Sequence, residues 1–391
     1  MIARVLQAYA GNFYLEYHRW SRLFSASGVR VHVSSCDVFP ESEAQRAALA
    51  DLGGVSISLQ RSIEREPDPY VHRRTVTDVH FAFSQAQAER EQLSGSRVRQ
   101  FITAGYPLDD AFPAASTCAQ GLRAQLRTQG VVFSVCFFDE NHGIHRKWHG
   151  GTRQIQADYR FLCDRLLEDP TLGLILKPKH RGSLPQRLGL VWPRVQRLID
   201  DGRCLLLDGP SLDERYLPCV AALASDVAIS LAGGSTAGLE GFLAGTRTLL
   251  IRHGVRPGIF GCLPGSVLFE TWEELWKAVE RLRDNPSDRQ TGNWAPIVEN
   301  LASCRDGQSA QRIQAYITWL YHALATGKTR EEAMDDAGRR YAAAWGADLV
   351  AEITRPLMAV GSSVIRWPFP GAKGGAAEGS EGMAQTASAH R

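Results

Sequence analysis

Residues 225–241 read Ser-Asp-Val-Ala-Ile-Ser-Leu-Ala-Gly-Gly-Ser-Thr-Ala-Gly-Leu-Glu-Gly. An apolar run over 227–231 leads directly into two glycines, and a serine and a threonine then stand where a helix needs its N-cap. Glycines let a backbone approach a ligand closely, and the N–H groups and dipole of a helix N-terminus attract an anion. The stretch therefore predicts a buried strand, a turn that binds phosphate, and a helix, with an ordinary tight turn as the alternative. The residues predicted to bind phosphate are Gly233, Gly234, Ser235 and Thr236.

The same alternation of short apolar strands and amphipathic helices surrounds this stretch. Strands are expected at 131–137, 172–177, 204–207, 227–231 and 248–251, and helices at 153–168, 186–200, 212–224 and 235–244. Such alternation is typical of a parallel sheet that is covered by helices on both faces. The sequence therefore predicts a Rossmann-like nucleotide-binding domain over 131–307, in which ligands collect at the carboxyl ends of the strands.

The hydrophobic patterns outside residues 131–307 are weaker than those within this range. Residues 1–110 predict a short Rossmann-like domain with strands at 3–8, 29–33, 78–83 and 98–103 and helices at 14–24 and 85–93. The stretch 111–130 lacks a strong period and is expected to be a hinge. Apolar stripes predict helices over 308–360, and the Gly/Ala/Ser-rich end at 361–391 predicts a disordered tail.

Composition excludes several classes of function. The 44 basic and 42 acidic residues leave a formal charge of +2, which gives no reason to expect nucleic acid as a partner. No secretory signal is visible, and no apolar stretch reaches the ~20 residues that span a bilayer. The eight cysteines form no Cys-x-x-Cys pair, which favours buried free thiols over disulfides or a zinc site. A cytoplasmic protein is predicted, and peripheral contact with a membrane is compatible with these observations.

Two further segments place ionisable side chains directly after the ends of predicted strands. Lys177, Lys179 and His180 follow the strand at 172–177, where they could neutralise phosphate or lie in a solvated basic loop. Asp139 and Glu140 follow the strand at 131–137, where either carboxylate could act as a general base. A polar loop without catalytic function is the alternative there.

Three histidines follow the two carboxylates, at 142, 145 and 149. Their spacing is close to helical, but glycines at 143, 150 and 151 oppose a stable helix, and no acidic cluster completes a metal shell. The prediction is therefore a site without metal or resident cofactor, in which a nucleotide-sugar is substrate.

The order of these motifs resembles the GT-B glycosyltransferases of bacterial surface polysaccharide synthesis, especially those near the Kdo, sialic acid and polyol-phosphate transferases. The resemblance covers residues 98–325 and rests on Gly105-Tyr-Pro-Leu-Asp109, Asp139-Glu140, the Lys-Pro-Lys-His loop and the stretch 225–240. It implies two Rossmann-like domains that face a cleft, with the donor nucleotide-sugar on the C-terminal domain. It also implies that the helix at 308–324 packs back towards the first domain.

Carried over by position, the resemblance implies that Lys177, Lys179 and His180 meet the donor phosphates or nucleotide. Ser235 and Thr236 would bind phosphate, and Glu240 would lie near the ribose or the sugar. Relatives that use CMP or CDP donors carry His-Pro where this chain has Lys179-His180, so the donor base stays open. The first half is also short for a complete acceptor domain.

The predicted function is transfer of a sugar from a nucleotide-sugar donor to a surface polysaccharide or glycolipid acceptor. One alternative keeps the fold and changes the reaction to that of a nucleotide-sugar epimerase or hydrolase. Another is a non-catalytic nucleotide-sugar binding or assembly subunit, which the short first half suggests.

Overall fold

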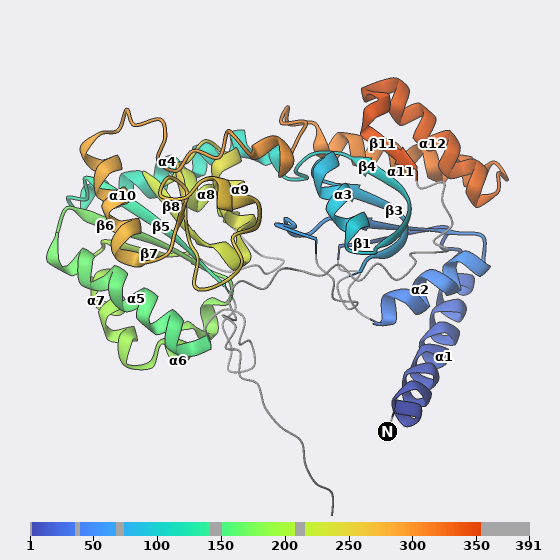
Figure 1. The fold of residues 1–391 in the computed structure, drawn as a ribbon, viewed down its shortest axis with the longest axis horizontal. Coiled ribbons are helices and arrows are strands. Elements are labelled where there is room, and N and C mark those ends of the chain that lie inside the picture. Colours follow the sequence, from blue (N-terminus) through green and yellow to red (C-terminus); the bar gives the residue numbers. More distant parts are fainter. Residues whose placement is uncertain (1, 36–39, 68–73, 141–150, 208–215, 353–391) are drawn as a thin grey trace, which may run out of the picture. The chain divides into compact units, whose positions relative to one another are not determined.

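The computed structural model describes residues 2–35, 40–67, 74–140, 151–207 and 216–352. These residues form two sheets of mainly parallel strands with helices packed against them (Figure 1). The α/β class and the two Rossmann-like sheets are therefore as predicted. Among the described residues, no helix is long and apolar enough to cross a membrane. The tail predicted at 361–391 lies outside the described residues.

The first sheet has the strand order β1–β2–β3–β4–β11. Its parallel strands are β1 (Val31–Ser34), β2 (Val55–Leu59), β3 (Val76–Ala82) and β4 (Arg97–Thr103), and β11 (Val350–Glu352) runs antiparallel to β4. The helix α1 (Ile2–Ser27) precedes β1, α2 (Pro40–Asp51) lies between β1 and β2 in the chain, and α3 (Gln85–Leu93) lies between β3 and β4. The strand β2 was not predicted, although its Val-Ser-Ile-Ser-Leu sequence alternates in the way that a strand requires.

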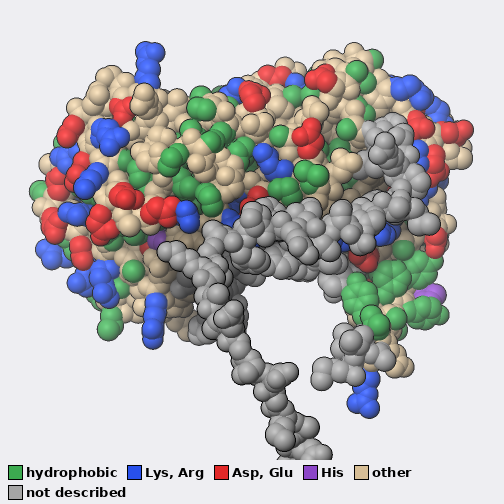
Figure 2. Space-filling model, in the orientation of Figure 1, with side chains coloured by type: hydrophobic (Ala, Val, Ile, Leu, Met, Phe, Trp, Pro, Cys, Tyr) green, Lys and Arg blue, Asp and Glu red, His purple; other side chains and the backbone are tan. Residues whose placement is uncertain are grey.

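The strand predicted at 3–8 was wrong, because these residues belong to the 26-residue helix α1. A short apolar run does not distinguish a strand from a helix, whereas Leu6, Phe13, Tyr17 and Trp20 continue one helical spacing beyond it. Much of this helix is solvent-exposed, and Figure 2 shows hydrophobic side chains on the surface where Figure 1 places α1.

The C-terminal helices complete the core of the first sheet. Tyr316 and Leu320 of α11 (Ser309–Ala325) and Tyr341 of α12 (Arg330–Trp345) are buried against Phe81 and Ile102 of the sheet. The Tyr341 hydroxyl also donates a hydrogen bond to a carbonyl of β4 at 2.8 Å. The helix expected at 308–324 therefore packs on the first sheet, and residues 309–352 supply what the short first half lacks.

The stretch 111–130, predicted as a hinge, contains the 17-residue helix α4 (Phe112–Thr128). Its buried face consists of Ala115, Ala119, Leu122 and Leu126, which recur at helical spacing. Two of these four residues are alanines, and their small side chains gave the sequence too little hydrophobic contrast to reveal the period.

The second sheet has the strand order β10–β9–β8–β5–β6–β7, and all of its strands are parallel. The strands are β5 (Phe133–Asp139), β6 (Leu172–Pro178), β7 (Cys204–Leu206), β8 (Val227–Leu231), β9 (Thr248–Ile251) and β10 (Leu268–Phe269). The helices are α5 (Gly151–Glu168), α6 (Leu184–Leu188), α7 (Trp192–Asp200), α8 (Pro218–Leu223), α9 (Thr236–Leu243) and α10 (Trp272–Asp284). The predicted alternation is confirmed here, except that the helix expected at 186–200 is divided into α6 and α7. Of the helix expected at 212–224, residues 212–215 lie outside the described residues, and α8 begins at Pro218.

Apolar clusters cover both faces of the second sheet. One joins the sheet to α5, α7 and α10, and the other joins it to α4 and α8. Four thiols lie inside this half of the protein, at Cys136, Cys163, Cys204 and Cys219, and no disulfide is formed among the described cysteines. Buried free thiols were predicted, although Cys118 and Cys262 are exposed.

Candidate functional site

Three predicted segments meet at one edge of the second sheet. Strand β5 pairs with β6 on one side and with β8 on the other, so that Phe138 lies between Lys177 and Ser230. The carboxyl ends of these three strands therefore point to the same edge, where ligands bind in open parallel sheets. Sequence alone suggested three separate loops, and the strand order makes them neighbours.

The loop after β8 leads into α9 with Ser235 at the N-cap position. The Ser235 side chain makes no capping hydrogen bond, and its buried hydroxyl has no hydrogen-bond partner among the described residues. The Thr236 hydroxyl accepts a hydrogen bond from the backbone N–H of Ile63 at 3.1 Å. The sequence reasoning missed this contribution of the loop after β2, because it comes from 173 residues away.

Glu140 lies directly against this loop. A Cβ atom on Gly234 would lie 1.9 Å from Glu140 Oε1, so the close approach requires a glycine at this position. Lys179 Nζ is 3.2 Å from Glu140 Oε2, although the lysine side chain is 45% exposed and the pair is screened by water. Glu140 therefore connects the loop after β8 with the loop after β6.

Asp139 has a different environment from Glu140. Its carboxylate is fully buried, 3.1 Å from Arg187 Nη2, and it accepts a hydrogen bond of 2.9 Å from the Tyr159 hydroxyl. Burial raises the pKa of Tyr159 well above its usual value, which keeps the hydroxyl protonated as a donor. Arg187 also donates to the carbonyls of Glu140 and His180. The ion pair therefore holds the loops after β5 and β6 together.

The carboxylate of Glu240 is also enclosed by protein. Its two oxygens accept hydrogen bonds from the Tyr106 hydroxyl at 2.5 Å and from the backbone N–H of Cys219 at 2.8 Å, and the residue is 2% exposed. Burial raises the pKa of Glu240, against the opposing effects of these hydrogen bonds and of the Lys177 charge. The resemblance implied a position near ribose or sugar, whereas both oxygens here bind the protein itself.

The other predicted residues differ in exposure. Lys177 is a buried residue of β6, Gly233 is partly exposed, and Lys179 and His180 are exposed beyond the strand end. The three histidines at 142, 145 and 149 lie outside the described residues. In the part of the chain that is described, no group of three or more His, Cys, Asp or Glu side chains is arranged to hold a metal ion.

A buried histidine–carboxylate pair at the same edge was missed by the sequence reasoning. His253 follows β9 with a φ of 47°, and its Nε2 is 3.0 Å from Oδ2 of the fully buried Asp158. Trp272 Nε1 donates to Asp158 Oδ1 at 2.7 Å. These residues come from three distant segments without a recognisable motif, so only the folded chain brings them together.

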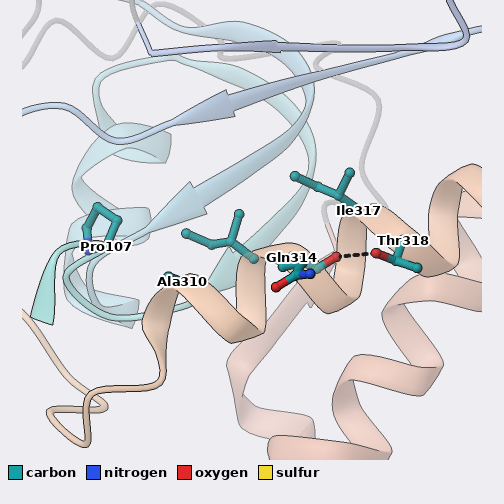
Figure 3. Close-up of a pocket in the computed structure, with 6 residues that line it drawn as sticks. Pro107, Ala310, Gln314, Ile317 and Thr318 are labelled. Carbon is teal, nitrogen blue, oxygen red and sulfur yellow. Dashed lines mark hydrogen bonds between the residues drawn. The ribbon is translucent and has the colours of Figure 1, made fainter. Parts of the chain in front are cut away.

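A pocket of about 390 Å³ lies along α11 (Figure 3). It is lined by Pro107, Ala310, Ile313, Gln314, Ile317 and Thr318. The Thr318 hydroxyl is turned back onto the helix and donates to the Gln314 carbonyl at 2.8 Å. None of the predicted site residues lines this pocket.

Comparison with known proteins finds relatives at the level of structure. No protein-family model and no curated sequence matches the chain. Similar solved structures include Staphylococcus aureus MnaA with UDP, which has a TM-score of 0.54 at 14% identity and covers 82% of this chain and 83% of its own. A putative UDP-N-acetylglucosamine 2-epimerase from Listeria monocytogenes has a TM-score of 0.51 at 15% identity, over 80% of this chain and 79% of its own.

A UDP-GlcNAc 2-epimerase from Methanocaldococcus jannaschii, in complex with UDP-GlcNAc and UDP, has a TM-score of 0.50 at 13% identity, over 80% of this chain and 82% of its own. At such low identity, these likenesses establish the fold alone. The chain has a GT-B-like fold, in agreement with the expectation from sequence.

Proposed function

We propose that the chain binds a nucleoside diphosphate sugar at the carboxyl edge of the second sheet and transfers its sugar to an acceptor hydroxyl. The observation that carries this proposal is the start of α9, where the buried Ser235 hydroxyl has no hydrogen-bond partner among the described residues. Lys177 and Lys179 stand at the end of β6, two strands away in the same sheet. A diphosphate would find a helix N-terminus and ammonium groups at one sheet edge.

The proposed chemistry uses these groups to stabilise the leaving group. Breaking the bond between the sugar and the diphosphate leaves additional negative charge on the phosphate oxygens. Backbone N–H groups at the start of α9 and the charges of Lys177 and Lys179 would lower the energy of that charge. We infer that Ser235 and Thr236 contact one phosphate and that the lysines neutralise the other.

The proposed base is Glu140, with Asp139 as a positioning residue. The Asp139 carboxylate is engaged by Arg187 and Tyr159 and is fully buried, whereas the Glu140 side chain is 17% exposed beside the loop after β8. A base must reach the acceptor hydroxyl to remove its proton. Glu140→Gln should therefore lower turnover at saturating donor, and wild-type turnover in this variant would exclude the role.

A second candidate function is epimerisation or hydrolysis of the donor alone. It is favoured by the comparison, because two of the similar structures are described as UDP-GlcNAc 2-epimerases, one of them putative. Incubation with UDP-GlcNAc without acceptor separates the candidates. Conversion or release of the sugar without an acceptor supports epimerisation or hydrolysis, and acceptor-dependent loss supports transfer.

Donor binding is tested first, by thermal unfolding with UDP, CDP, GDP, CMP and their sugars. A ligand at a hundred times its Kd should add about 2.7 kcal/mol to the free energy of unfolding. Ser235→Ala with Lys179→Ala should weaken binding by about tenfold or more, since charge-assisted hydrogen bonds contribute roughly 1.5–3 kcal/mol. The matched control is Thr128→Ala with Lys277→Ala, which removes the same groups from exposed positions. A folded protein that binds none of these nucleotides would refute the proposal.

A further inference from the structure

His253 lies in the loop that follows β9, at the edge of the second sheet where the candidate site lies. Strand β9 pairs with β8, and Ile251 at the end of β9 is opposite Leu231 at the end of β8. His253 comes two residues after Ile251, and Gly233 comes two residues after Leu231. The histidine and the loop that leads to Ser235 therefore leave the sheet from neighbouring strand ends.

The imidazole of His253 is held by a buried carboxylate. Its Nε2 is 3.0 Å from Oδ2 of Asp158, whose side chain is fully buried in α5. The other oxygen, Asp158 Oδ1, accepts hydrogen bonds from Trp272 Nε1 at 2.7 Å and from Gln154 Nε2 at 3.0 Å. Both of these donors are neutral, and no lysine or arginine of the described residues forms an ion pair with Asp158. A proton on His253 would therefore supply the positive charge that a buried carboxylate requires.

The second nitrogen of the His253 ring is open to a ligand. Nδ1 has no hydrogen-bond partner among the described residues, and it is not one of their buried polar atoms without a partner, so it reaches solvent. The rest of the ring is enclosed, because the side chain is only 10% exposed. With hydrogen on Nε2 for Asp158, Nδ1 has a lone pair in the neutral ring and an N–H donor in the protonated ring.

The backbone at His253 has a conformation that most side chains disfavour. Its φ is 47°, in the left-handed region, and the following Gly254 has a φ of 72°. Glycine adopts this conformation without steric cost, whereas other residues do so rarely. Residues held in such conformations cluster at ligand-binding sites, where the surrounding structure maintains them. An imidazole at a position where glycine would fit more easily therefore indicates a use for that side chain.

We propose that His253 binds a phosphate group of the nucleotide, with Nδ1–H as the donor and Asp158 as the residue that orients the ring. This inference rests on the proposed nucleotide binding. It adds a contact from β9, which lies on the opposite side of β8 from Lys177 of β6. A protonated imidazole between a buried carboxylate and a phosphate has an anion on each side. Hydrogen bonds from such a charged donor are shorter and stronger than those between neutral groups.

The charges around His253 are compatible with an anion. The loop after β9 contains two arginines and no acidic residue, and the loop between β8 and α9 contains no charged residue. Arg252 forms an ion pair with Glu270 at 2.6 Å, and Glu140 of the loop after β5 is 3.2 Å from Lys179. These carboxylates are paired with cations, so they oppose an anion beside His253 only weakly.

The test is calorimetric binding of UDP and of inorganic pyrophosphate to the full chain. His253→Gln keeps a polar side chain that cannot carry charge. We expect it to weaken both ligands by roughly tenfold to a hundredfold, the range of one charge-assisted hydrogen bond. The matched control is His322→Gln, which makes the same change at an exposed position of α11 and should bind both ligands as the wild type does. Circular dichroism verifies that both variants are folded.

A nitrogen NMR spectrum of the wild-type imidazoles separates ligand contact from a structural role. The His253 signal is the one missing from the spectrum of His253→Gln. With UDP bound, Nδ1 should be protonated and its resonance should shift from the ligand-free position. A resonance that UDP leaves unchanged would overturn the inference, and so would a His253→Gln variant that binds both ligands as tightly as the wild type; nucleotide binding itself would still stand. A folded wild type that binds neither ligand would overturn the proposed function together with this inference.

Discussion

Replacing Arg187 by methionine tests whether Asp139 positions the site or performs its chemistry. In the wild type, Arg187 Nη2 lies 3.1 Å from the Asp139 carboxylate, and the two side chains are 10% and 0% exposed. Methionine fills much of the same volume without charge. The variant therefore leaves Asp139 buried beside Tyr159 with its cationic partner removed.

The magnitude follows from the burial of the pair. Removing one partner of a buried ion pair costs about 3–5 kcal/mol, because the remaining charge stays desolvated. The hydroxyl of Tyr159 still donates to Asp139, so we expect the lower end, about 3 kcal/mol, which corresponds to a factor of roughly 150 in the folding equilibrium. The same change removes hydrogen bonds to the carbonyls of Glu140 and His180, so nucleotide affinity should fall as well.

The assay is urea unfolding of four proteins: the wild type, Arg187→Met, Asp139→Asn, and the double variant. The double-mutant cycle should give a coupling energy of about 2–3 kcal/mol, since the double variant has no unpaired buried charge. A coupling energy below about 0.5 kcal/mol would refute the reasoning. An Asp139→Asn variant with wild-type stability but no turnover would also refute it, by returning Asp139 to a catalytic role.

Three further predictions concern stability. Burial raises the pKa of Glu240, so its contribution to the free energy of unfolding is fully present below the ordinary glutamate pKa of about 4.3 and is lost as pH rises through the folded value. Glu240→Gln should flatten that fall in urea unfolding measured at increasing pH from about pH 4, and parallel profiles would contradict this. Tyr106→Phe leaves one oxygen of the buried Glu240 without its donor and should cost roughly 1.5–3 kcal/mol by the same measurement, so an unchanged denaturation midpoint would exclude this contact as a stabilising one. Thr329→Ala removes the capping box of α12 and should cost about 1 kcal/mol, compared with little for the control Thr318→Ala on the exposed face of α11; equal losses in both would argue against the cap.

The second sheet could be predicted well from the sequence because its signals are local. Strands such as Val227–Leu231 and Thr248–Ile251 are short apolar runs bounded by polar residues and glycine-containing turns, and the structure has them at the predicted residues. One predicted strand was wrong and one helix was missed where the local signal was ambiguous. An apolar run at 3–8 fits either a strand or a helix, and the alanines of α4 gave little contrast between its buried and exposed faces.

The residue types of the candidate site were likewise readable in the sequence. Gly234 and Ser235 follow a buried strand and precede a helix, and that order alone predicts a backbone turn suited to an anion. Lysines and carboxylates at neighbouring strand ends were visible in the same way. The positions of these strands, turns and helix starts were therefore determined by local sequence. The hydrophobic period marks the strands and helices, and glycines and helix-capping residues mark the turns between them.

Only the tertiary structure decided how these residues are used. Asp139 and Glu140 are adjacent in sequence, yet Arg187 and Tyr159, at separations of 48 and 20 residues, enclose the first and leave the second beside Gly234. In the same way, packing of residues 309–352 on the first sheet completed a half that looked short by itself. The physical reason is that burial and ion pairing depend on which distant segments meet. The hydrophobic period of a segment indicates which of its faces is buried, but it does not indicate which distant segment packs against that face.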